Sequence, residues 1–431
     1  MNKELVLFGV TGDLAKQKLI PALFNLYRSG NISRKSSFIG FGRKKFSKVD
    51  FQNFIEEVVL KYAAVSGYKD IDTSIIRDYS SQWSYVESEL DDSKGYKKLA
   101  SLLTDQTVVY LSIPPIYQYG VVQMLISSGV LAKSNRRKVA IEKPYGFDLK
   151  SSEKLESLLT RKLREEQILR VDHYAGKQAL VELEQAARQG IFKNALSFNT
   201  IKKIQVNFTE SKDVAMRGSF YDAVGALNDI FQNHMLHMLA TILSLPEVQR
   251  YQKNVSKNDH QHQITLGDIR DKVLSGLTIK DVKNSLVLAQ YEGFSATPGV
   301  QPNSITETFF KVQGEIKKGR DSVSKRWGGL QIEFVGGKAL SESDSSIILV
   351  PKSKKDELVK ILINGYGTRE AYEQIFIDSF YYNKDRFINF NQIQRGWEIV
   401  EKIKKNWKKK GLNKILVYKK GAYPHDISYK S

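Results

Sequence analysis

Two short polar segments carry residue types suited to chemistry. Asp172–Lys177 (DHYAGK) places a carboxylate, an imidazole, a phenol and an ammonium group at the end of an expected strand, and Asn228–His234 (NDIFQNH) lies in a long apolar helical stretch. Histidine, tyrosine and lysine side chains can together bind a phosphate through charge-assisted hydrogen bonds. We therefore expect Asp172–Lys177 to bind a phosphate and to leave Asp172 available to orient another group.

His234 and His237 are three residues apart and share one helix face, a spacing that could suggest a metal pair. No further histidine lies near them in the sequence, and the chain has no cysteine. We therefore expect no bound metal. A buried histidine with satisfied hydrogen bonds is the alternative interpretation of His234.

A glycine-containing turn, Gly9–Leu14 (GVTGDL), joins the first expected strand to the first expected helix. Glycine permits positive φ and close approach of the backbone, and a helix N-terminus attracts a pyrophosphate. A simple tight turn is the alternative, but the position at the opening of a βαβ unit favours dinucleotide binding.

The second expected strand is followed by Arg43, Lys44 and Lys45, where an NAD site would usually carry an acidic residue. A cationic group suits the 2′-phosphate of NADP, whereas a solvated basic turn is the alternative. Lys143, in Glu142–Gly146 (EKPYG), ends another expected strand. Because ligands of open α/β sheets bind outside the carboxyl ends of the strands, Lys143 should project toward the same site.

Alternating strand and helix patterns position these motifs in the first part of the chain. Helical patterns cover residues 14–28 and a region from about residue 50, and the expected strands are 4–9, 37–41, 108–113, 138–142 and 168–171. This alternation predicts a parallel sheet with right-handed crossovers. We therefore expect an α/β Rossmann-like dinucleotide-binding domain at residues 1–176.

The pattern changes after about residue 178. Helical patterns cover 225–245 and 391–405, and the expected strands are 201–208, 306–316, 330–334, 347–350 and 358–363. Strands without regular intervening helices predict an α+β domain with a large, mainly antiparallel sheet at residues 177–431.

Composition agrees with a folded chain of this kind. The 431 residues suffice for two domains, and 41% hydrophobic with 26% charged residues is typical of globular proteins. No apolar run approaches the roughly 18 residues of a membrane span. The net charge of +19 is spread along the chain without a nucleic-acid-binding signature, so we expect a generic basic surface. We expect a soluble, cytoplasmic protein.

The motifs resemble the signature segments of the glucose-6-phosphate dehydrogenase family in order and approximate spacing. The segments that carry the resemblance are Gly9–Leu14, Glu142–Gly146, Asp172–Lys177 and Gln232–His234, with further similarity at 298–300, 304–309, 337–340 and 371–373. The resemblance implies NADP-dependent oxidation of glucose 6-phosphate at C1 to 6-phosphoglucono-1,5-lactone, the first step of the oxidative pentose phosphate pathway. We also expect weaker use of NAD, because the pyrophosphate and nicotinamide contacts are common to both cofactors. The resemblance further implies a homodimer formed through the sheet of the second domain, which would bind the substrate.

The resemblance further implies roles for individual residues. His234 matches the general base that takes the proton of the C1 hydroxyl, and Asp172 matches the carboxylate that orients this imidazole. The matches for the 6-phosphate are His173, Tyr174 and Lys177. The matches for the sugar hydroxyls are Lys143, Glu210, Asp229 and Lys338. The matches for the cofactor are Gly9, Thr11, Gly12, Asp13, Leu14, Lys18, Arg43 and Lys143.

The chain departs from the family at several supporting positions. The family usually has arginine where this chain has Asn228, Thr200, Val335 and Ser343. We expect these departures to affect catalytic efficiency, stability and any second structural cofactor site more than the reaction class.

Two alternatives remain open. One is a dehydrogenase of the same fold that acts on a modified hexose 6-phosphate, such as a 2-amino or 2-epimeric sugar. The other is a non-catalytic sensor or nucleic-acid-binding protein on the same scaffold. The presence of both His234 and Asp172 disfavours the second, because a binding module needs no base.

Overall fold

The computed structural model describes residues 2–63, 72–192, 196–255, 265–280, 285–365, 369–381, 383–409 and 415–428. Two compact units make up the chain. The first consists of Met1–Gly176 with Arg369–Ile388, and the second of Lys177–Thr368 with Asn389–Ser431.

A six-stranded parallel sheet forms the centre of the first unit. Its order is β3-β2-β1-β4-β5-β6, with β1 (Glu4–Phe8), β2 (Ser37–Gly42), β3 (Trp83–Glu87), β4 (Val108–Leu111), β5 (Lys138–Ile141) and β6 (Ile168–Arg170). This order is that of a doubly wound dinucleotide-binding fold. The predicted α/β Rossmann-like class is confirmed. Strand β3 was not among the expected strands.

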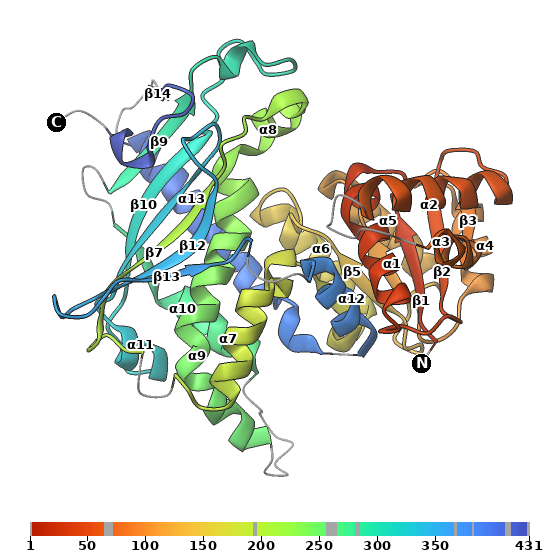
Figure 1. Ribbon diagram of the computed structural model, residues 1–431, viewed down its shortest axis with the longest axis horizontal. Helices are drawn as coiled ribbons and strands as arrows, with labels where there is room; N and C mark the ends of the chain where they lie inside the picture. Colours follow the sequence, from red (N-terminus) through yellow and green to blue (C-terminus); the bar gives the residue numbers. More distant parts are fainter. Residues whose placement is uncertain are drawn as a thin grey trace. The chain divides into compact units, whose positions relative to one another are not determined.

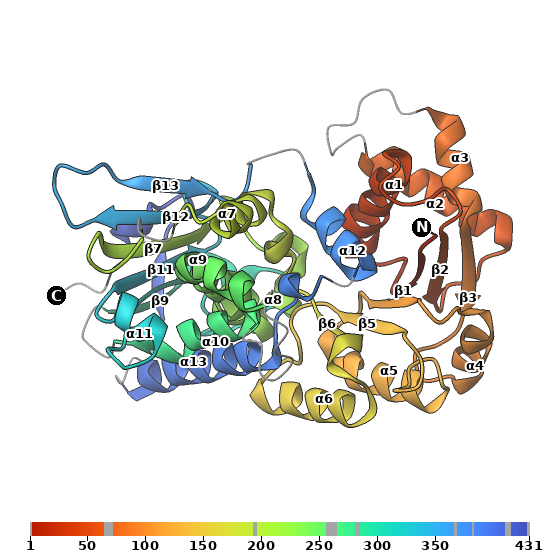
Figure 2. The same cartoon turned by 90° about the horizontal axis from the view of Figure 1, so that it is seen from below.

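Helices cover both faces of this sheet (Figure 2). One layer contains α1 (Ile20–Arg28), α2 (Lys48–Ala63) and α3 (Thr73–Ser81), and the other contains α4 (Ser93–Leu102), α5 (Pro115–Ser127) and α6 (Leu149–Lys162). The carboxylates of Asp72, Asp92 and Asp148 accept backbone N–H groups at the starts of α3, α4 and α6. These N-caps fix where the helices begin after the preceding loops.

The segment around α12 (Ala371–Tyr381) belongs to the first unit, although the sequence placed all residues after 176 in the second. Its apolar side packs on α1, where Tyr372, Ile375 and Phe376 join the core beside the sheet. Asn25 of α1 donates a 3.2 Å hydrogen bond to the carboxylate of Glu373. Contacts over more than 300 residues of chain thus determine the place of this helix, and sequence periodicity carries no signal for them.

A mixed sheet of eight strands forms the second unit (Figure 1). The order is β13-β12-β7-β11-β10-β9-β14, with β8 on β10, and the strands are β7 (Ile201–Thr209), β8 (Leu277–Ile279), β9 (Leu286–Tyr291), β10 (Phe309–Ile316), β11 (Gln331–Gly337), β12 (Asp344–Pro351), β13 (Val359–Leu362) and β14 (Leu416–Tyr418). The pairs β7–β11 and β9–β14 are parallel and the remaining pairs are antiparallel. The predicted mainly antiparallel sheet is confirmed.

Helices of the second unit gather on one face of its sheet (Figures 1 and 2). They include α7 (Gln178–Arg188), α8 (Gly218–Ala226), α9 (Leu236–Val255), α10 (Leu266–Gly276) and α13 (Phe390–Lys409), while α11 (Ser322–Trp327) lies at one end. The expected helix at 225–245 is broken at Gly225, where φ is 72°, and continues as a π-helix, η6 (Leu227–Met235), before α9. π-Helical turns are rare and are often found at functional sites.

Short helical turns complete the described chain. They are the π-helix η1 (Ala15–Leu19) and the 3₁₀ helices η3 (Glu165–Gln167), η4 (His173–Gly176), η5 (Ala215–Arg217), η7 (Phe294–Ala296), η8 (Lys384–Arg386) and η9 (Pro424–Asp426). Within the ranges given above, none of the helices combines the length and the apolar character that a bilayer crossing requires.

Candidate functional site

The turn after β1 has the backbone geometry expected of Gly9–Leu14. Gly9 has a φ of 70°, and a Cβ at this position would lie 2.3 Å from the carbonyl oxygen of Ser112, so glycine is required. The amide of Gly12 donates to the carbonyl of Gly9 over 2.8 Å and closes the turn. Gly12 and Asp13 are exposed, and Thr11 and Leu14 are partly buried. The turn therefore presents polar backbone to the carboxyl edge of the sheet.

Lys18 lies on η1, one helical turn after the glycine turn. Its ammonium group contacts the carboxylate of Glu370 over 2.5 Å, at the start of the α12 segment. Asp13 contacts Lys16 instead, over 3.1 Å. The lysine that was predicted from the family pattern is thus held beside the turn by a carboxylate that is remote in sequence.

The basic residues after β2 lie at the same sheet edge as the glycine turn. Strands β1 and β2 are parallel neighbours, and the amide of Gly9 donates to the carbonyl of Phe41 over 3.2 Å. Arg43 and Lys44 follow directly and are exposed, and the phenol of Tyr85 donates to the carbonyl of Lys44. Arg43 therefore lies two residues after the hydrogen-bond partner of Gly9, and its side chain is exposed.

The Glu142–Gly146 turn follows β5 and is held by Gln118 of α5. The amide of Gln118 donates to the carbonyls of Glu142 (3.0 Å) and Pro144 (3.1 Å), and its oxygen accepts the N–H of Gly146 (3.1 Å). Gly146 has a φ of 71°. Gln118 is buried, and it fixes the backbone that carries Lys143. Sequence spacing did not indicate a role for this glutamine, because its partners lie more than 20 residues away.

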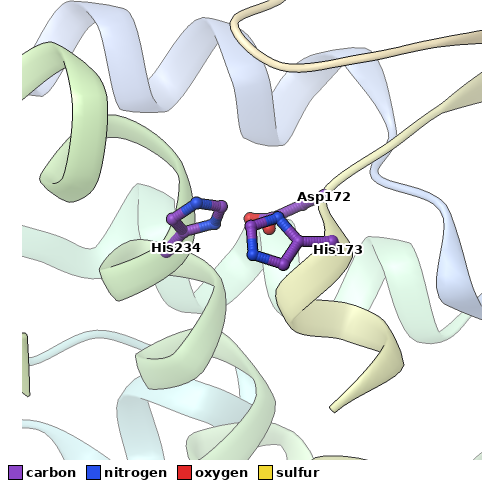
Figure 3. Close-up of side chains that lie close together, drawn as sticks. All are labelled: Asp172, His173 and His234. Carbon is purple, nitrogen blue, oxygen red and sulfur yellow. The ribbon is translucent and has the colours of Figure 1, made fainter. Parts of the chain in front are cut away.

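Asp172 and His173 leave the end of β6 and enter η4 (Figure 3). Asp172 is fully buried, and its Oδ1 accepts the N–H of Tyr174 over 2.9 Å. The His173 ring stacks on Tyr372 of α12, with centroids 5.3 Å apart and planes 13° apart. The ring of Tyr174 meets His173 at an angle of 64°. Tyr372 is therefore a supporting residue that sequence spacing did not reveal.

Glu142 is the buried carboxyl next to this group. Burial raises the pKa of Glu142 to about 7, against the opposing effects of the Tyr110 hydrogen bond and the charge of Lys143. Burial also raises the pKa of Tyr372 well above its usual value, and the charges of Glu142 and Asp172 add to this effect. The carboxyl end of the sheet thus combines a carboxyl group that titrates near neutrality with cationic and aromatic side chains.

Predicted residues of the second unit fall into two groups. In the first, Glu210 after β7 forms an ion pair with Lys338 after β11, because the two strands are parallel neighbours. The side chain of Lys338 is 5% exposed, and its ammonium group lies 5.7 Å from the centre of the Tyr221 ring. Two residues that were predicted separately as sugar-hydroxyl ligands are therefore paired within this unit. Lys177 lies at the start of α7, where its carbonyl accepts the N–H of Val181.

The second group lies on η6. His234 is 2% exposed, and its ring stacks on Phe208 of β7, with centroids 5.9 Å apart. Its backbone N–H donates to the side chain of Asn233 over 2.6 Å. Figure 3 shows His234 on this helix. Asp229, one helical turn earlier, is partly buried. His237, which was not assigned a role, lies 3.4 Å from the hydroxyl of Thr241.

The four positions at which the chain departs from the family pattern all lie in the second unit. The amide of Ser211 donates to the hydroxyl of Ser343 over 2.9 Å, and the Thr200 hydroxyl donates to the carbonyl of Ser197. Val335 is a buried residue of β11. The side-chain oxygen of Asn228 accepts a hydrogen bond from Lys404 of α13 over 3.1 Å. Asn228, which stands where the family usually has arginine, thus has a cationic partner from another helix.

Comparison with known families identifies both units. Residues 6–181 match the model for the glucose-6-phosphate dehydrogenase NAD binding domain, and residues 187–364 match the model for the glucose-6-phosphate dehydrogenase C-terminal domain. The chain belongs to the glucose-6-phosphate dehydrogenase family. The family predicted from the motifs is therefore confirmed, with a first unit that is a nicotinamide dinucleotide-binding domain by family.

Individual relatives of this family match along most of the chain. The glucose-6-phosphate 1-dehydrogenase of Borreliella burgdorferi is 28% identical over 94% of this chain and 92% of its own length. That of Aggregatibacter actinomycetemcomitans is 30% identical over 81% of this chain and 71% of its own length.

Solved structures of the same family share the fold. The Mycobacterium avium glucose-6-phosphate 1-dehydrogenase has a TM-score of 0.75 and 24% identity, covering 98% of this chain and 95% of its own. A glucose-6-phosphate dehydrogenase in complex with its substrate glucose 6-phosphate has a TM-score of 0.78 and 22% identity, covering 100% and 98%.

Proposed function

We propose that this chain catalyses the oxidation of glucose 6-phosphate at C1 to 6-phosphoglucono-1,5-lactone, with NADP as the hydride acceptor. The observation that carries the proposal is the family match across both units. The residues that we assign as base, orienting carboxylate and phosphate ligands, namely His234, Asp172, His173, Tyr174 and Lys177, all lie within the matched ranges.

In this proposal, His234 accepts the proton of the C1 hydroxyl. Its burial and its stacking on Phe208 limit the orientations available to the imidazole ring. Asp172 orients that imidazole and stabilises its cationic form, a task that suits a buried carboxylate. The remaining requirement is correct placement of C1, since alignment of the reacting atoms supplies much of the acceleration.

Substrate binding is divided between phosphate and hydroxyl contacts. We assign the 6-phosphate to His173, Tyr174 and Lys177, and the hydroxyls to Lys143, Glu210, Asp229 and Lys338. The ion pair of Glu210 with Lys338 supports this assignment, because it holds one acceptor and one donor group together in a fixed orientation.

The residues at the carboxyl edge of the first sheet fit a dinucleotide phosphate. We assign the pyrophosphate to Gly9–Leu14, the 2′-phosphate to Arg43, and the junction with the sugar to Lys18 and Lys143. The positive φ of Gly9, the exposed Gly12 and the exposed guanidinium of Arg43 suit close approach of an anion. NADP supplies the hydride acceptor when bound, and NAD is the weaker alternative.

A direct absorbance assay tests the proposed function. Purified protein is mixed with glucose 6-phosphate, mannose 6-phosphate, glucosamine 6-phosphate or glucose, each with NADP or NAD, and reduced nicotinamide is followed by its ultraviolet absorbance. We expect the highest kcat/KM for glucose 6-phosphate with NADP. A higher kcat/KM for a 2-epimeric or 2-amino sugar phosphate would favour the alternative substrate class. Absence of turnover with all of these sugars would reject the proposed dehydrogenase activity.

We also propose that the protein is a cytoplasmic homodimer formed through the second unit. This expectation comes from the family, and light scattering of the purified chain measures the mass in solution. A monomer at micromolar concentration would contradict it.

A further inference from the structure

Lys404 on α13 reaches the first turn of η6, the helix that carries Asp229 and His234. Its ammonium group donates to the side-chain oxygen of Asn228 over 3.1 Å. The two helices pack closely: a Cβ at Gly396 of α13 would lie only 2.5 Å from the carbonyl oxygen of Gln232 on η6. The position from which Lys404 extends is therefore fixed by helix packing.

A buried carboxylate lies at the same helix end. Glu307 is 7% exposed, and its Oε1 accepts the N–H of Leu227, the first residue of η6, over 3.0 Å. Its carbonyl accepts the N–H of Ala226 over 3.0 Å. A carboxylate that accepts N–H groups at a helix start stabilises that start. Glu307 thus acts as a cap supplied by the segment that precedes β10.

Burial and Lys404 act on this carboxyl in opposite directions. Burial raises the pKa of Glu307, whereas the positive charge of Lys404 and the Leu227 N–H lower it. Lys404 therefore favours the ionised form of Glu307, which accepts hydrogen bonds more strongly than the neutral form.

Hydrogen bonds extend from Asn228 to the proposed base. The side-chain amide of Asn233 donates to the carbonyl of Asn228 over 3.2 Å. The side-chain oxygen of Asn233 accepts the N–H of His234 over 2.6 Å. Lys404, Asn228, Asn233 and the backbone of His234 are thus connected within one unit by three consecutive hydrogen bonds.

We propose that Lys404 is a positioning residue, which fixes the first turn of η6 through Asn228 and so orients Asp229 and His234. Its ammonium group provides, from another helix, the positive charge that the family pattern carries at position 228 itself. The catalytic part of this statement rests on the proposed function, whereas the effect of Lys404 on η6 does not.

The kinetic test compares Lys404→Met with Lys405→Met, which removes a neighbouring exposed lysine from the same helix. Displacement of reacting groups by about 1 Å can lower rates by about 100-fold, so we expect kcat to fall between about 5- and 100-fold for Lys404→Met. We expect an unchanged KM for NADP, and parent-like kinetics for Lys405→Met and Lys404→Arg. Equal kinetics of Lys404→Met and Lys405→Met would overturn the proposal.

A double variant that moves the positive charge from position 404 to position 228 separates the positioning role of Lys404 from a general effect on stability. Asn228→Arg combined with Lys404→Met returns the cation to η6, and we expect it to recover most of the kcat lost by Lys404→Met alone. Asn228→Arg in the presence of Lys404 places two cations together and should lower kcat. A double variant no faster than Lys404→Met would contradict the proposed exchange of charge.

Hydrogen exchange measured by mass spectrometry gives a readout that does not depend on turnover. We expect faster exchange in the peptide covering residues 226–235 of Lys404→Met, and no change there in Lys405→Met. Unchanged exchange would overturn the positioning role. Faster exchange in a chain whose parent oxidises no sugar phosphate would instead reject the proposed function and leave the effect of Lys404 on η6 established.

Discussion

The phenol of Tyr110 donates a 2.5 Å hydrogen bond to the carboxyl group of Glu142, and both side chains are buried at the carboxyl end of the first sheet. The second oxygen of Glu142 accepts the N–H of Lys143 over 3.2 Å. One carboxyl group therefore fixes the backbone of a proposed substrate-binding lysine while remaining in an environment that disfavours its charge.

The raised pKa of Glu142 predicts a dependence of stability on pH. The folded chain retains this proton up to about pH 7, whereas the unfolded chain releases it near pH 4.5. The free energy of unfolding of the parent should therefore fall between these two pH values relative to Glu142→Gln, which does not titrate. At about 1.4 kcal/mol per pKa unit, the relative change is at most roughly 3.5 kcal/mol.

Urea unfolding of the parent and Glu142→Gln at pH 5 and pH 8 measures this difference. The glutamine variant loses hydrogen-bond geometry at both pH values, so the informative quantity is the change between them. Glu153→Gln, which alters an exposed carboxyl on α6, is the matched control. A difference between parent and Glu142→Gln that stays constant over this range would mean that Glu142 is ionised throughout.

His234→Asn tests the proposed base. Loss of a general base typically lowers turnover by about 10²–10⁴-fold, and the buried position should accept asparagine without a large loss of stability. We expect kcat to fall within that range, with a much smaller change in the KM for glucose 6-phosphate. Steady-state kinetics that stay within about threefold of the parent would reject the assignment.

Asp172→Asn should also act on turnover, because the imidazolium would lose the charge that stabilises it. Its backbone role is retained in part, since an asparagine oxygen can still accept the N–H of Tyr174. We expect kcat to fall more than the KM rises. A change confined to the KM would identify Asp172 as a substrate ligand instead.

Local sequence patterns were sufficient for the fold class of each unit and for the turns that carry the motifs. They did not predict strands β3, β8, β9 and β14 or the place of α12 in the first unit. The glycines of Gly9–Leu14 were expected to permit positive φ in a turn between a strand and a helix, and Gly9 has a φ of 70° there. The apolar runs of β1 and β4 were recognised because both faces of a parallel sheet are buried. β3 was missed because Trp83 and Val86 are its only buried residues.

Long-range partners could not be predicted from the same patterns. Tyr372 reaches His173 only because α12 returns to the first unit, and Lys404 meets Asn228 across 176 residues. Neither contact has a periodicity or a spacing in the sequence. The family motifs single out the residues that we propose for the reaction, whereas the side chains that contact them are found only in the three-dimensional structure.

Lys177→Ala tests recognition of the 6-phosphate. A charge-assisted hydrogen bond contributes about 1.5–3 kcal/mol, so the KM for glucose 6-phosphate should rise roughly 10- to 100-fold. Turnover of free glucose should stay as poor as in the parent, because glucose has no phosphate to lose contact with. Equal losses with glucose and glucose 6-phosphate, measured by initial rates, would place Lys177 elsewhere.

Arg43→Ala tests the choice of cofactor. Arg43 follows β2, the strand from which Rossmann sites contact the adenosine ribose, and Lys44 and Lys45 add positive charge to the same exposed turn. Removal of the guanidinium should weaken the binding of NADP by about 1.5–3 kcal/mol and leave the binding of NAD nearly unchanged, because only NADP carries the 2′-phosphate.

Added salt should raise the KM for NADP more than that for NAD in the parent. This difference should be smaller in Arg43→Ala, because the charge pair that salt screens is absent there. Lys48→Ala, an exposed lysine at the start of α2, controls for a general loss of positive charge. Equal weakening of NADP and NAD by Arg43→Ala would show that the basic turn serves the fold, and the preference for NADP would then lack its main support.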